Sequence, residues 1–308
     1  MKILVTGGAG FIGSNLVRRL LADEVARVAV IDDYSTGSPE NLTGLDVEMF
    51  EGSILDLSLL ERAAADAHAI VHLAARPSVP RSIKDPRASH EANAPGTLNI
   101  LEAARIVGAH VSVASSSSVY GANPTLPKHE DLRPHPISPY AVSKLAAETY
   151  ALAYAEVYDV PVLPFRFFNV FGPGQAAGHA YAAVVPAFLD AALAGRPIPI
   201  HGDGLQTRDF TFVDTVTEVL SGAARSRIRS DMPVNLAFGT RHSLLEVIAI
   251  MEDLIGQPLE REHTDPRPGD VRDSQAANDR LRNLFPDVQP VPLRDGLART
   301  LDWFRSNQ

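Results

Sequence analysis

A tyrosine and a lysine stand four residues apart, at Tyr140 and Lys144. Residues at this spacing lie one above the other on a helix, so the phenol and the ammonium would share one face of a helix that begins near Pro139. A neighbouring lysine stabilises the phenolate, and the tyrosine could then exchange a proton near neutral pH. The same spacing also arises by chance on amphipathic helices, so the pair indicates catalysis only in combination with other motifs.

A run of four serines, 115–118, lies upstream of this pair and directly after an apolar segment at 111–115. Serine runs ordinarily serve turns, but this run falls where the carboxyl end of a buried strand is expected, and ligands bind at such ends in parallel sheets. The proline-rich segment 124–139 predicts a surface loop, and Pro139 suits the first turn of a helix. We therefore expect the serines and Tyr140 to lie close together.

Three glycines, Gly7, Gly10 and Gly13, connect an apolar strand at 2–6 with a helical pattern at 14–21. Glycines at these positions provide a tight turn, a close approach of the backbone and close helix packing, which together place a pyrophosphate on a helix N-terminus. This strand–glycine–helix order predicts a dinucleotide-binding unit.

Two acids, Asp32 and Asp33, end a second predicted strand at 28–31. A carboxylate at this position accepts hydrogen bonds from the adenosine ribose diol and repels a 2′-phosphate. No arginine lies between Asp32 and Pro39, so the sequence favours NAD over NADP. The alternative is that both acids only cap the turn after the strand.

Strands and helices continue to alternate along the first half of the chain, which predicts a doubly wound parallel α/β sheet of the Rossmann type. The further strands are expected at 47–50, 69–75, 111–115 and 162–168, and the long helices at 93–107 and 140–158. His72 is expected to be a buried strand-end residue, because no second ligand stands at metal spacing. No metal site is predicted.

The pattern changes after residue 168, which predicts a smaller α/β lobe toward the C-terminus. We expect a helix at 181–193, a short strand at 198–200, a return to the sheet at 234–237 and a final amphipathic helix at 293–304. The predicted NAD-binding domain is 1–168 with 207–237 returning to it, and the predicted substrate lobe is 169–206 with 238–308.

Composition narrows the function classes. The 308 residues exceed what one hydrophobic core usually serves, and the net charge of −9 argues against nucleic acid or an anionic membrane surface as partner. No run approaches the ~20 apolar residues of a membrane span, and the N-terminus does not resemble a secretory signal. The absence of cysteine excludes disulfides and thiol catalysis and favours a cytoplasmic location.

Taken in order, these motifs resemble the extended short-chain dehydrogenase/reductases, in the group of NAD-dependent sugar-nucleotide epimerases and dehydratases. The resemblance spans essentially the whole chain, through the segments 6–13, 72–75, 93–97, 115–121, 138–144, 166–173 and 202–210. Segments around the expected sugar site are most similar to those of UDP-N-acetylhexosamine 4-epimerases, at 78–82, 180–186 and 269–275.

The resemblance implies that Tyr140 is the acid/base, that Lys144 binds the nicotinamide ribose and that Ser116 bonds the sugar hydroxyl. Dehydratases of the family carry an Asp-Glu pair where this chain has Ser117 and Ser118, and the related decarboxylases carry a glutamate at the position of Ser118. Serine cannot replace either acid at neutral pH. Elimination and decarboxylation are therefore disfavoured.

The remaining site residues are implied by the same resemblance, and Arg208 and Arg267 would hold the diphosphate. Ser53 stands where many members have an aspartate near the adenine. The implied cofactor contacts are Gly7, Gly10, Phe11, Ile12, Gly13, Asp32, Asp33, Ser35, Thr36, Gly37, Ser53, Ile54, Leu73, Ala74, Ala75, Asn93, Ser115, Tyr140, Lys144 and Phe168. The implied substrate contacts are Ser78, Ser116, Ser117, Ser118, Asn169, Ala183, Val184, Pro199, Ile200, His201, Arg208, Arg267, Asp270 and Ser274.

The implied activity is that of a UDP-sugar 4-epimerase working through a 4-keto intermediate with retained NAD. Ser274, four residues after Asp270, is small, so the pocket would admit UDP-GlcNAc and UDP-GalNAc as well as UDP-glucose and UDP-galactose. The alternatives are a UDP-glucuronate 4-epimerase, a dehydratase or 4-keto reductase, and a non-catalytic protein of the same fold. The helices at 93–107 and 140–158 would form a homodimer surface or simply cover the sheet.

Overall fold

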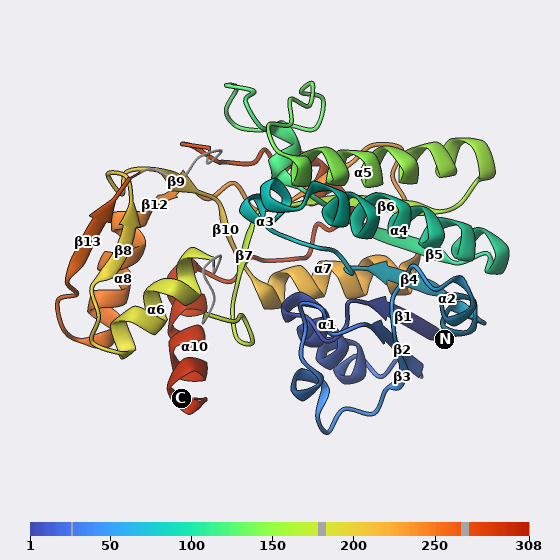
Figure 1. Ribbon diagram of the computed structural model, residues 1–308, viewed down its shortest axis with the longest axis horizontal. Helices are drawn as coiled ribbons and strands as arrows, with labels where there is room; N and C mark the ends of the chain where they lie inside the picture. The colour runs from blue at the N-terminus through green and yellow to red at the C-terminus, as the bar shows by residue number, and fades with distance from the viewer. Residues whose placement is uncertain (26, 178–182, 266–270, 308) are drawn as a thin grey trace.

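The computed structural model describes residues 1–25, 27–177, 183–265 and 271–307. Its centre is a seven-stranded sheet, in the order β11-β6-β5-β4-β1-β2-β3, with every neighbouring pair parallel (Figure 1). The strands are β1 (Lys2–Thr6), β2 (Arg27–Asp32), β3 (Glu48–Glu51), β4 (Ala69–His72), β5 (His110–Ser116), β6 (Val162–Phe167) and β11 (Val234–Leu236). This is the predicted doubly wound sheet.

Helices cover both faces of this sheet because alternate strand residues point to opposite sides. Ile3 and Val5 pack in one apolar cluster and Leu4 in the other. The helices of the first face are α1 (Phe11–Ala22), α7 (Val213–Ser226) and α9 (Asp279–Leu284). Those of the second face are α2 (Leu57–Ala64), α4 (Pro86–Val107) and α5 (Pro139–Tyr158). Short 3-10 turns lie at η1 (Pro39–Leu42) and η2 (Ser117–Tyr120).

Helix boundaries differ from the prediction where a cap lies further upstream. Helix α4 begins at Pro86 and not at residue 93, because Asp85 accepts a hydrogen bond from the Ala88 amide (3.1 Å) and a proline suits the first turn. Pro95 lies inside this helix without ending it. Helix α5 begins as predicted, with Ser138 as its cap.

The second lobe has its own apolar core and three two-stranded sheets. Its helices are α6 (Val184–Leu193), α8 (Leu244–Ile255) and α10 (Leu293–Ser306). Its strands pair as β7 (Asn169–Phe171) with β10 (Phe210–Phe212), β9 (Thr207–Arg208) with β12 (His242–Ser243), and β8 (Ile198–His201) with β13 (Arg261–Thr264). The short helix α3 (Val79–Lys84) follows β4 on the side of the sheet domain. The first residues of the helix predicted at 181–193 lie outside the described residues.

Packing qualifies the predicted division of the chain at two places. Within 207–237, the strands β9 and β10 pair with strands of the second lobe, and only α7 and β11 join the central sheet. Further on, Leu281 and Phe285 at α9 pack in the core of the sheet domain. The division into a cofactor domain and a substrate lobe stays a proposal. No helix among the described residues is both long and apolar enough to span a bilayer.

Candidate active site

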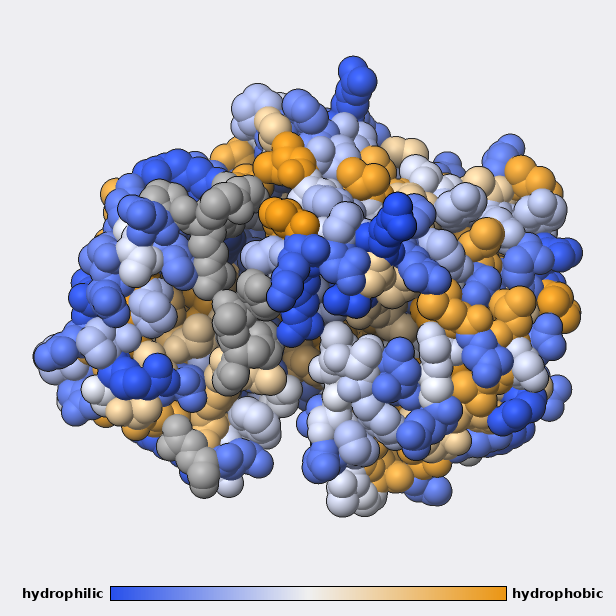
Figure 2. Space-filling model, in the orientation of Figure 1, coloured by the Kyte–Doolittle hydropathy of each residue, from blue (hydrophilic) through white to orange (hydrophobic). Residues whose placement is uncertain are grey.

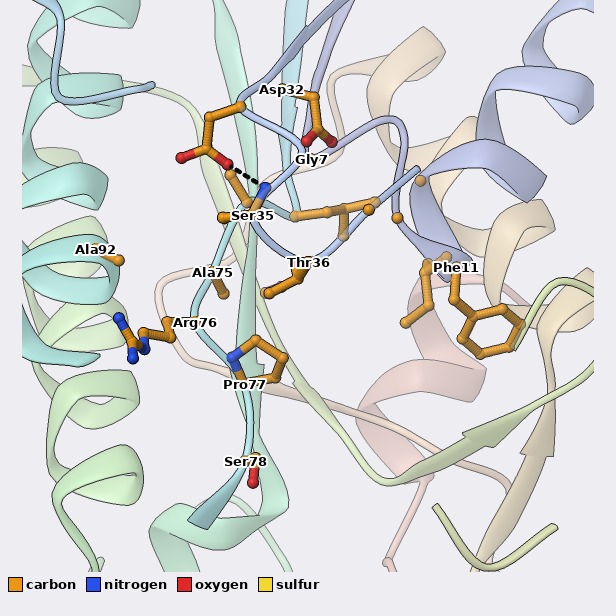
Figure 3. Close-up of a pocket in the computed structure, with 18 of the residues that line it drawn as sticks. Gly7, Phe11, Asp32, Ser35, Thr36, Ala75, Arg76, Pro77, Ser78 and Ala92 are labelled. Carbon is orange, nitrogen blue, oxygen red and sulfur yellow. Dashed lines mark hydrogen bonds between the residues drawn. The ribbon is translucent and has the colours of Figure 1, made fainter. Parts of the chain in front are cut away.

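A cavity of about 1130 Å³ lies at the carboxyl ends of the central strands. Its lining comes from the turn after β1, the ends of β2, β4 and β5, and the start of α5, while Ala183 and Trp303 contribute from the second lobe. The space-filling view shows a notch between the two halves of the molecule (Figure 2). The close-up shows the turn after β1, the end of β2 and the loop after β4 facing one space (Figure 3).

The glycine turn leaves no room for a side chain at Gly7 or Gly13. A Cβ on Gly13 would meet the Gly7 carbonyl oxygen at 2.1 Å, and one on Gly7 would meet the Ala74 amide nitrogen at 2.7 Å. Gly10 caps α1 without any side-chain bond, so no side chain covers the amides of the first turn. Bare backbone at a helix N-terminus fits the pyrophosphate of a dinucleotide.

Asp32 is buried and holds the adjoining loops. Its carboxylate accepts hydrogen bonds from the amides of Ala9 (2.9 Å) and Tyr34 (2.8 Å), and Asp33 accepts one from the Ser35 amide (2.9 Å). Burial raises the pKa of Asp32, and the two amide bonds oppose this rise. Both acids therefore cap the turn, and Asp32, which also lines the cavity, keeps acceptor positions for a ribose diol.

Tyr140 and Lys144 line the cavity together with Ser116. The Lys144 ammonium donates to the Ala114 carbonyl at the end of β5 (2.8 Å), and burial lowers the pKa of this lysine to about 8. Burial raises the pKa of the Tyr140 phenol, and a hydrogen bond from Ser116 opposes that rise. The predicted lowering of the Tyr140 pKa by Lys144 is not seen, because burial dominates and Ser116 is the group that opposes the rise. Tyr140, Lys144 and Ser116 nevertheless line one cavity, so a phenol, an amine and a hydroxyl are available for proton transfer at a sugar hydroxyl.

The serine run divides at the cavity wall. Ser115 and Ser116 line the cavity. Ser118 turns back, and its amide (3.2 Å) and hydroxyl (2.8 Å) both donate to the Ser116 hydroxyl oxygen. Ser117 and Ser118 do not lie among the lining residues. They shape the turn that presents Ser116.

The implied cofactor residues converge on the cavity with the exception of Asn93. Asn93 is buried one layer behind, where its side chain accepts from the Arg76 amide (2.7 Å) and donates to the Ser143 hydroxyl (2.9 Å). It ties the loop after β4 to the catalytic helix. Nearby, His72 is buried and bonded to Thr6 (2.8 Å) and Thr97 (3.0 Å), and burial lowers its pKa to about 3. The prediction of a structural histidine is confirmed.

The implied substrate residues converge much less. Ser78, Ser116 and Ala183 line the cavity, while Ile200 is fully buried in the core of the second lobe and can offer only backbone. The others described outside the lining are Ser117, Ser118, Asn169, Val184, Pro199, His201, Arg208 and Ser274. The expected contacts of Arg267 and Asp270 lie outside the described residues.

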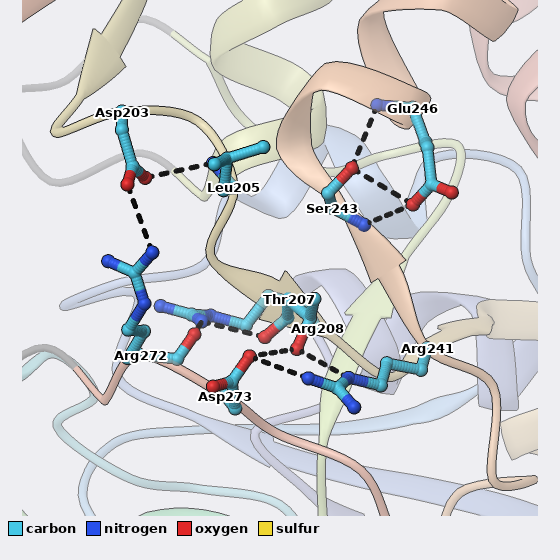
Figure 4. A network of polar contacts seen from close by, with 9 residues as sticks. All are labelled: Asp203, Leu205, Thr207, Arg208, Arg241, Ser243, Glu246, Arg272 and Asp273. Carbon is cyan, nitrogen blue, oxygen red and sulfur yellow. Dashed lines mark hydrogen bonds and ion pairs between the residues drawn. The ribbon is translucent and has the colours of Figure 1, made fainter.

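Arg208 belongs to a polar network of the second lobe (Figure 4). It donates to the carbonyls of Thr207 (2.8 Å) and Arg272 (3.0 Å), and Asp273 accepts from the Thr207 hydroxyl (2.6 Å) and from Arg241 (3.1 Å). The Ser274 amide donates to the Thr207 carbonyl in the same region (3.1 Å). Arg208 and Ser274 therefore lie close together, as a shared substrate site would require.

Several lining residues were not foreseen from the sequence. Arg76 and Pro77 follow the small residues Ala74 and Ala75 after β4, and Trp303 comes from the final helix, whereas Arg81 belongs to the segment 78–82 expected near the sugar. Ser78, between them, has a left-handed φ of 96°, which is strained for serine and often marks a functional loop. The position of Arg76 and Pro77 directly after a strand was the available signal, whereas Trp303, in the final helix, had no such signal. Among the described residues, no group of three His, Cys, Asp or Glu could hold a metal ion.

Comparison with known proteins agrees with this geometry. The model of the NAD dependent epimerase/dehydratase family matches residues 3–237. A UDP-glucose 4-epimerase of Mycolicibacterium smegmatis is 39% identical, over 99% of both chains. A UDP-N-acetylglucosamine 4-epimerase structure from Methanobrevibacter ruminantium, in complex with UDP-N-acetylmuramic acid, superposes with a TM-score of 0.94 at 33% identity and covers 100% of this chain and 99% of its own.

A UDP-glucose 4-epimerase structure from Thermus thermophilus, in complex with NAD, superposes with a TM-score of 0.91 at 35% identity over 100% of both chains. The glycine cradle and the buried Asp32 described above fit that cofactor. The chain belongs to the NAD-dependent epimerase/dehydratase family of extended short-chain dehydrogenase/reductases, and it is an enzyme whose cofactor is NAD.

Proposed function

We propose that this enzyme is a UDP-sugar 4-epimerase. The observation that carries the proposal is the distribution of acids around the cavity. Asp32 and Asp33 are the only acids among its described lining residues, and they lie at the end of β2. Strand β2 is three strands away from β5, which carries Ser116, or about 14 Å at the usual strand spacing. A dehydratase or a decarboxylase would need an acid beside Tyr140.

In this mechanism, the Tyr140 phenolate takes the proton of the C4 hydroxyl and later returns it. NAD held by the glycine turn and Asp32 would supply a hydride acceptor and donor for oxidation and re-reduction at C4. The Lys144 cation holds the phenolate charge, and the Ser116 hydroxyl bonds the C4 oxygen. Tyr140 is the only tyrosine among the described residues that line the cavity, and it is therefore the one assigned to this transfer.

Incubation with paired UDP-sugars tests the proposal, with products identified from their anomeric proton signals by NMR. We expect the C4 epimer to form with no net consumption of NAD. Appearance of a 4-keto-6-deoxy sugar or of carbon dioxide would replace the proposal with dehydration or decarboxylation. A net change in the redox state of the cofactor would instead indicate a 4-keto reductase.

We further propose that 2-acetamido sugars are accepted. The support is Ser274, whose small side chain follows the polar network around Arg208 and Asp273. Ser274 lies outside the lining of the described cavity, so this proposal extends the sugar site into the second lobe. A bulky residue in this place would then take the volume of an acetamido group. The same panel of UDP-sugars, run with UDP-GlcNAc and UDP-GalNAc beside UDP-glucose and UDP-galactose, decides this point.

UDP-uronic acids are the second candidate, because two guanidinium groups line the cavity. Arg76 and Arg81 flank Ser78, and Arg76 also pairs with Asp85 (3.5 Å). A carboxylate at C6 of a sugar would bond such groups strongly. Exclusive turnover of UDP-glucuronate in the panel would favour this candidate over the neutral and acetamido sugars.

A homodimer through α4 and α5 is also proposed. The two helices run side by side (Figure 1), and apolar residues remain on their outer surface. Ile106 and Val157 are each 67% exposed, and Tyr150 is 43% exposed. Val157→Glu should shift the protein from dimer to monomer in light scattering, whereas Leu205→Glu, at an exposed site of the second lobe, should not. Ordinary helix packing would leave both variants unchanged.

A further inference from the structure

A buried ion pair lies directly behind the catalytic wall. Glu148 of α5 and Arg166 of β6 have side chains that are 2% and 3% exposed. The guanidinium donates twice, from Nε to Glu148 Oε2 (2.9 Å) and from Nη2 to Oε1 (2.6 Å). Neither residue lines the cavity. Removing two charges from water is costly, and buried pairs are often no more stable than apolar replacements, so stability alone gives a weak reason for this pair.

Arg166 is held from all sides. Its guanidinium lies over the Tyr120 ring (4.7 Å from the centroid) and also donates to the Glu130 carbonyl (3.4 Å). Tyr120 donates to Asn235, the residue opposite Arg166 on β11 (2.7 Å). Although burial opposes its charge, the hydrogen bonds and the charge of Glu148 raise the pKa of Arg166. These contacts restrain the Arg166 guanidinium, so its two donors define where the Glu148 carboxylate binds.

Glu148 connects this fixed cation to the catalytic wall. Its Oε2 also accepts a hydrogen bond from the Ser115 hydroxyl on β5 (2.6 Å). On either side of Ser115 in the strand, Ala114 binds the Lys144 ammonium through its carbonyl (2.8 Å), and Ser116 bonds the Tyr140 phenol. Three consecutive strand residues thus bind three residues of α5.

The three helix residues, Tyr140, Lys144 and Glu148, are spaced four apart and share one face of α5. A slide or rotation of the helix against β5 would change all three contacts together. Glu148 is the member of this row that is also bonded to a buried cation on a second strand, Arg166 of β6. We call this row of three contacts, Ala114–Lys144, Ser115–Glu148 and Ser116–Tyr140, the register lock, because together they fix the position of α5 along β5.

We propose that Glu148, held by Arg166, is a positioning residue that fixes the register of α5 against β5 and so sets the spacing of the Tyr140 phenol, the Lys144 ammonium and the Ser116 hydroxyl. The proposal rests on the catalytic roles given to these three groups under the proposed function. It assigns to the ion pair a part in the chemistry that neither member performs by contact with substrate or NAD.

Glu148→Asp changes the position of the carboxylate without removing its negative charge, because aspartate is shorter than glutamate by one methylene. The shorter side chain cannot reach Ser115 and both guanidinium nitrogens at once. We expect kcat to fall about 10- to 100-fold, since small misplacements of reacting groups have effects of this size. The KM for UDP-sugar should change by less than about twofold, because substrate contacts are untouched.

The pH profile gives a second readout. The hydrogen bond from Ser116 opposes the rise in the pKa of the Tyr140 phenol. A phenol moved away from Ser116 has a higher pKa, so the acidic limb of kcat should move to higher pH in Glu148→Asp. The other titratable groups near the pair are Glu130, which pairs with Arg280 (3.7 Å), and the neutral phenol of Tyr120, and Glu148→Asp alters neither of them. Arg166→Lys, which keeps the cation but loses the paired donors, should shift the limb in the same direction.

Leu220→Ala is the matched control for destabilisation. Leu220 is fully buried in α7, on the opposite face of the sheet. The Leu220→Ala variant should have a lower Tm than wild type, with kcat and the position of the acidic limb unchanged. The proposal is overturned if folded Glu148→Asp and Arg166→Lys keep kcat within about twofold of wild type, or if they lose activity with the acidic limb unmoved.

An ultraviolet titration of tyrosinate keeps this test independent of turnover. The signal of Tyr140 is the difference between each protein and its Tyr140→Phe partner. Glu148→Asp should raise the pKa of this signal relative to wild type, even if no UDP-sugar tested is a substrate. An unchanged pKa overturns the register lock, whereas absence of epimer formation by wild type overturns the proposed function alone.

Discussion

The cofactor wall of the cavity and the second lobe opposite it are assembled from the sequence in different ways. The cofactor wall is built from short segments at the ends of neighbouring strands, and nearly all residues expected there line the cavity. The second lobe places most of its expected residues elsewhere, in pairings between distant segments such as β9 with β12 and Thr207 with Asp273. A motif within one turn fixes its own geometry, whereas a site assembled from three distant segments depends on the whole lobe.

The largest expected effect removes chemistry from the cofactor wall while leaving its shape. Tyr140→Phe should lower kcat by about 10² to 10⁴, since the phenol is the acid/base. NAD content and Tm should stay near wild type. These quantities are measured by turnover, by absorbance of the extracted cofactor and by thermal melting. A variant that keeps more than about a tenth of the wild-type rate would assign the proton transfer to another residue.

Gly13→Ala changes the shape of the cofactor wall and leaves the catalytic groups intact. The added Cβ would meet the Gly7 carbonyl oxygen at 2.1 Å, and backbone there cannot easily yield. We expect NAD affinity to fall about 10- to 100-fold, from overpacking of roughly 1–3 kcal/mol. Gly222→Ala is the control, because its Cβ would meet only Phe285 at 3.7 Å. Equal NAD affinity in both variants, measured by calorimetry, would contradict the claim that the close packing at Gly13 shapes the pyrophosphate site.

Lys144→Met tests whether the catalytic wall lowers stability. Burial lowers the pKa of Lys144 from 10.5 to about 8, which corresponds to about 3 kcal/mol of penalty for the charged form. The penalty is complete below pH 8 and disappears as the pH rises through 10.5. The variant should be inactive yet more stable than wild type at pH 7, and this advantage should shrink in melts toward pH 10.5. A less stable variant at pH 7 would show that the bond to Ala114 outweighs burial.

Ser274→Tyr probes the second lobe and carries the smallest expected effect. A tyrosine at this position should fill the volume of a 2-acetamido group, at a cost of about 1–3 kcal/mol. Turnover of UDP-GlcNAc and UDP-GalNAc should fall at least about 10-fold, while UDP-glucose and UDP-galactose are spared. Parallel kinetics on both pairs measure the ratio. An equal loss on both pairs, or refusal of acetamido sugars by wild type, removes Ser274 from this role.

The sequence was sufficient for elements with strong local signals. The strand β1, the glycine turn and Asp32 follow one another with little freedom, and the helix after Ser138 begins at its cap. Helices α7 and α8 were not predicted although local signals were present. Ser243 and Glu246 form a capping box before the apolar run of α8, and Gly256 ends that helix in the left-handed conformation. Helix α7 has an acid in its first turn and a base in its last turn.

The candidate site was also predictable where its residues lie in short local motifs. The pair of Tyr140 and Lys144 follows from spacing, the interest of the serine run from its strand position, and the choice of Ser116 from the family resemblance; the structure brings the three side chains to one wall. Asn93 was expected to contact NAD, but a buried amide with two partners serves equally well as a tie between loop and helix. The sequence shows that a polar residue is needed at such a position without showing which layer it occupies.

The wall residue Trp303 gives the enzyme an optical signal of its own. The sequence contains one tryptophan, and this residue projects from the final helix of the second lobe into the lining of the cavity, edge-on to Phe304 (ring centroids 5.1 Å apart). All tryptophan fluorescence of the protein therefore comes from one residue at the boundary between the two lobes. Quenching of that emission can count occupied sites and time the arrival of each ligand in the unmodified enzyme, without any label.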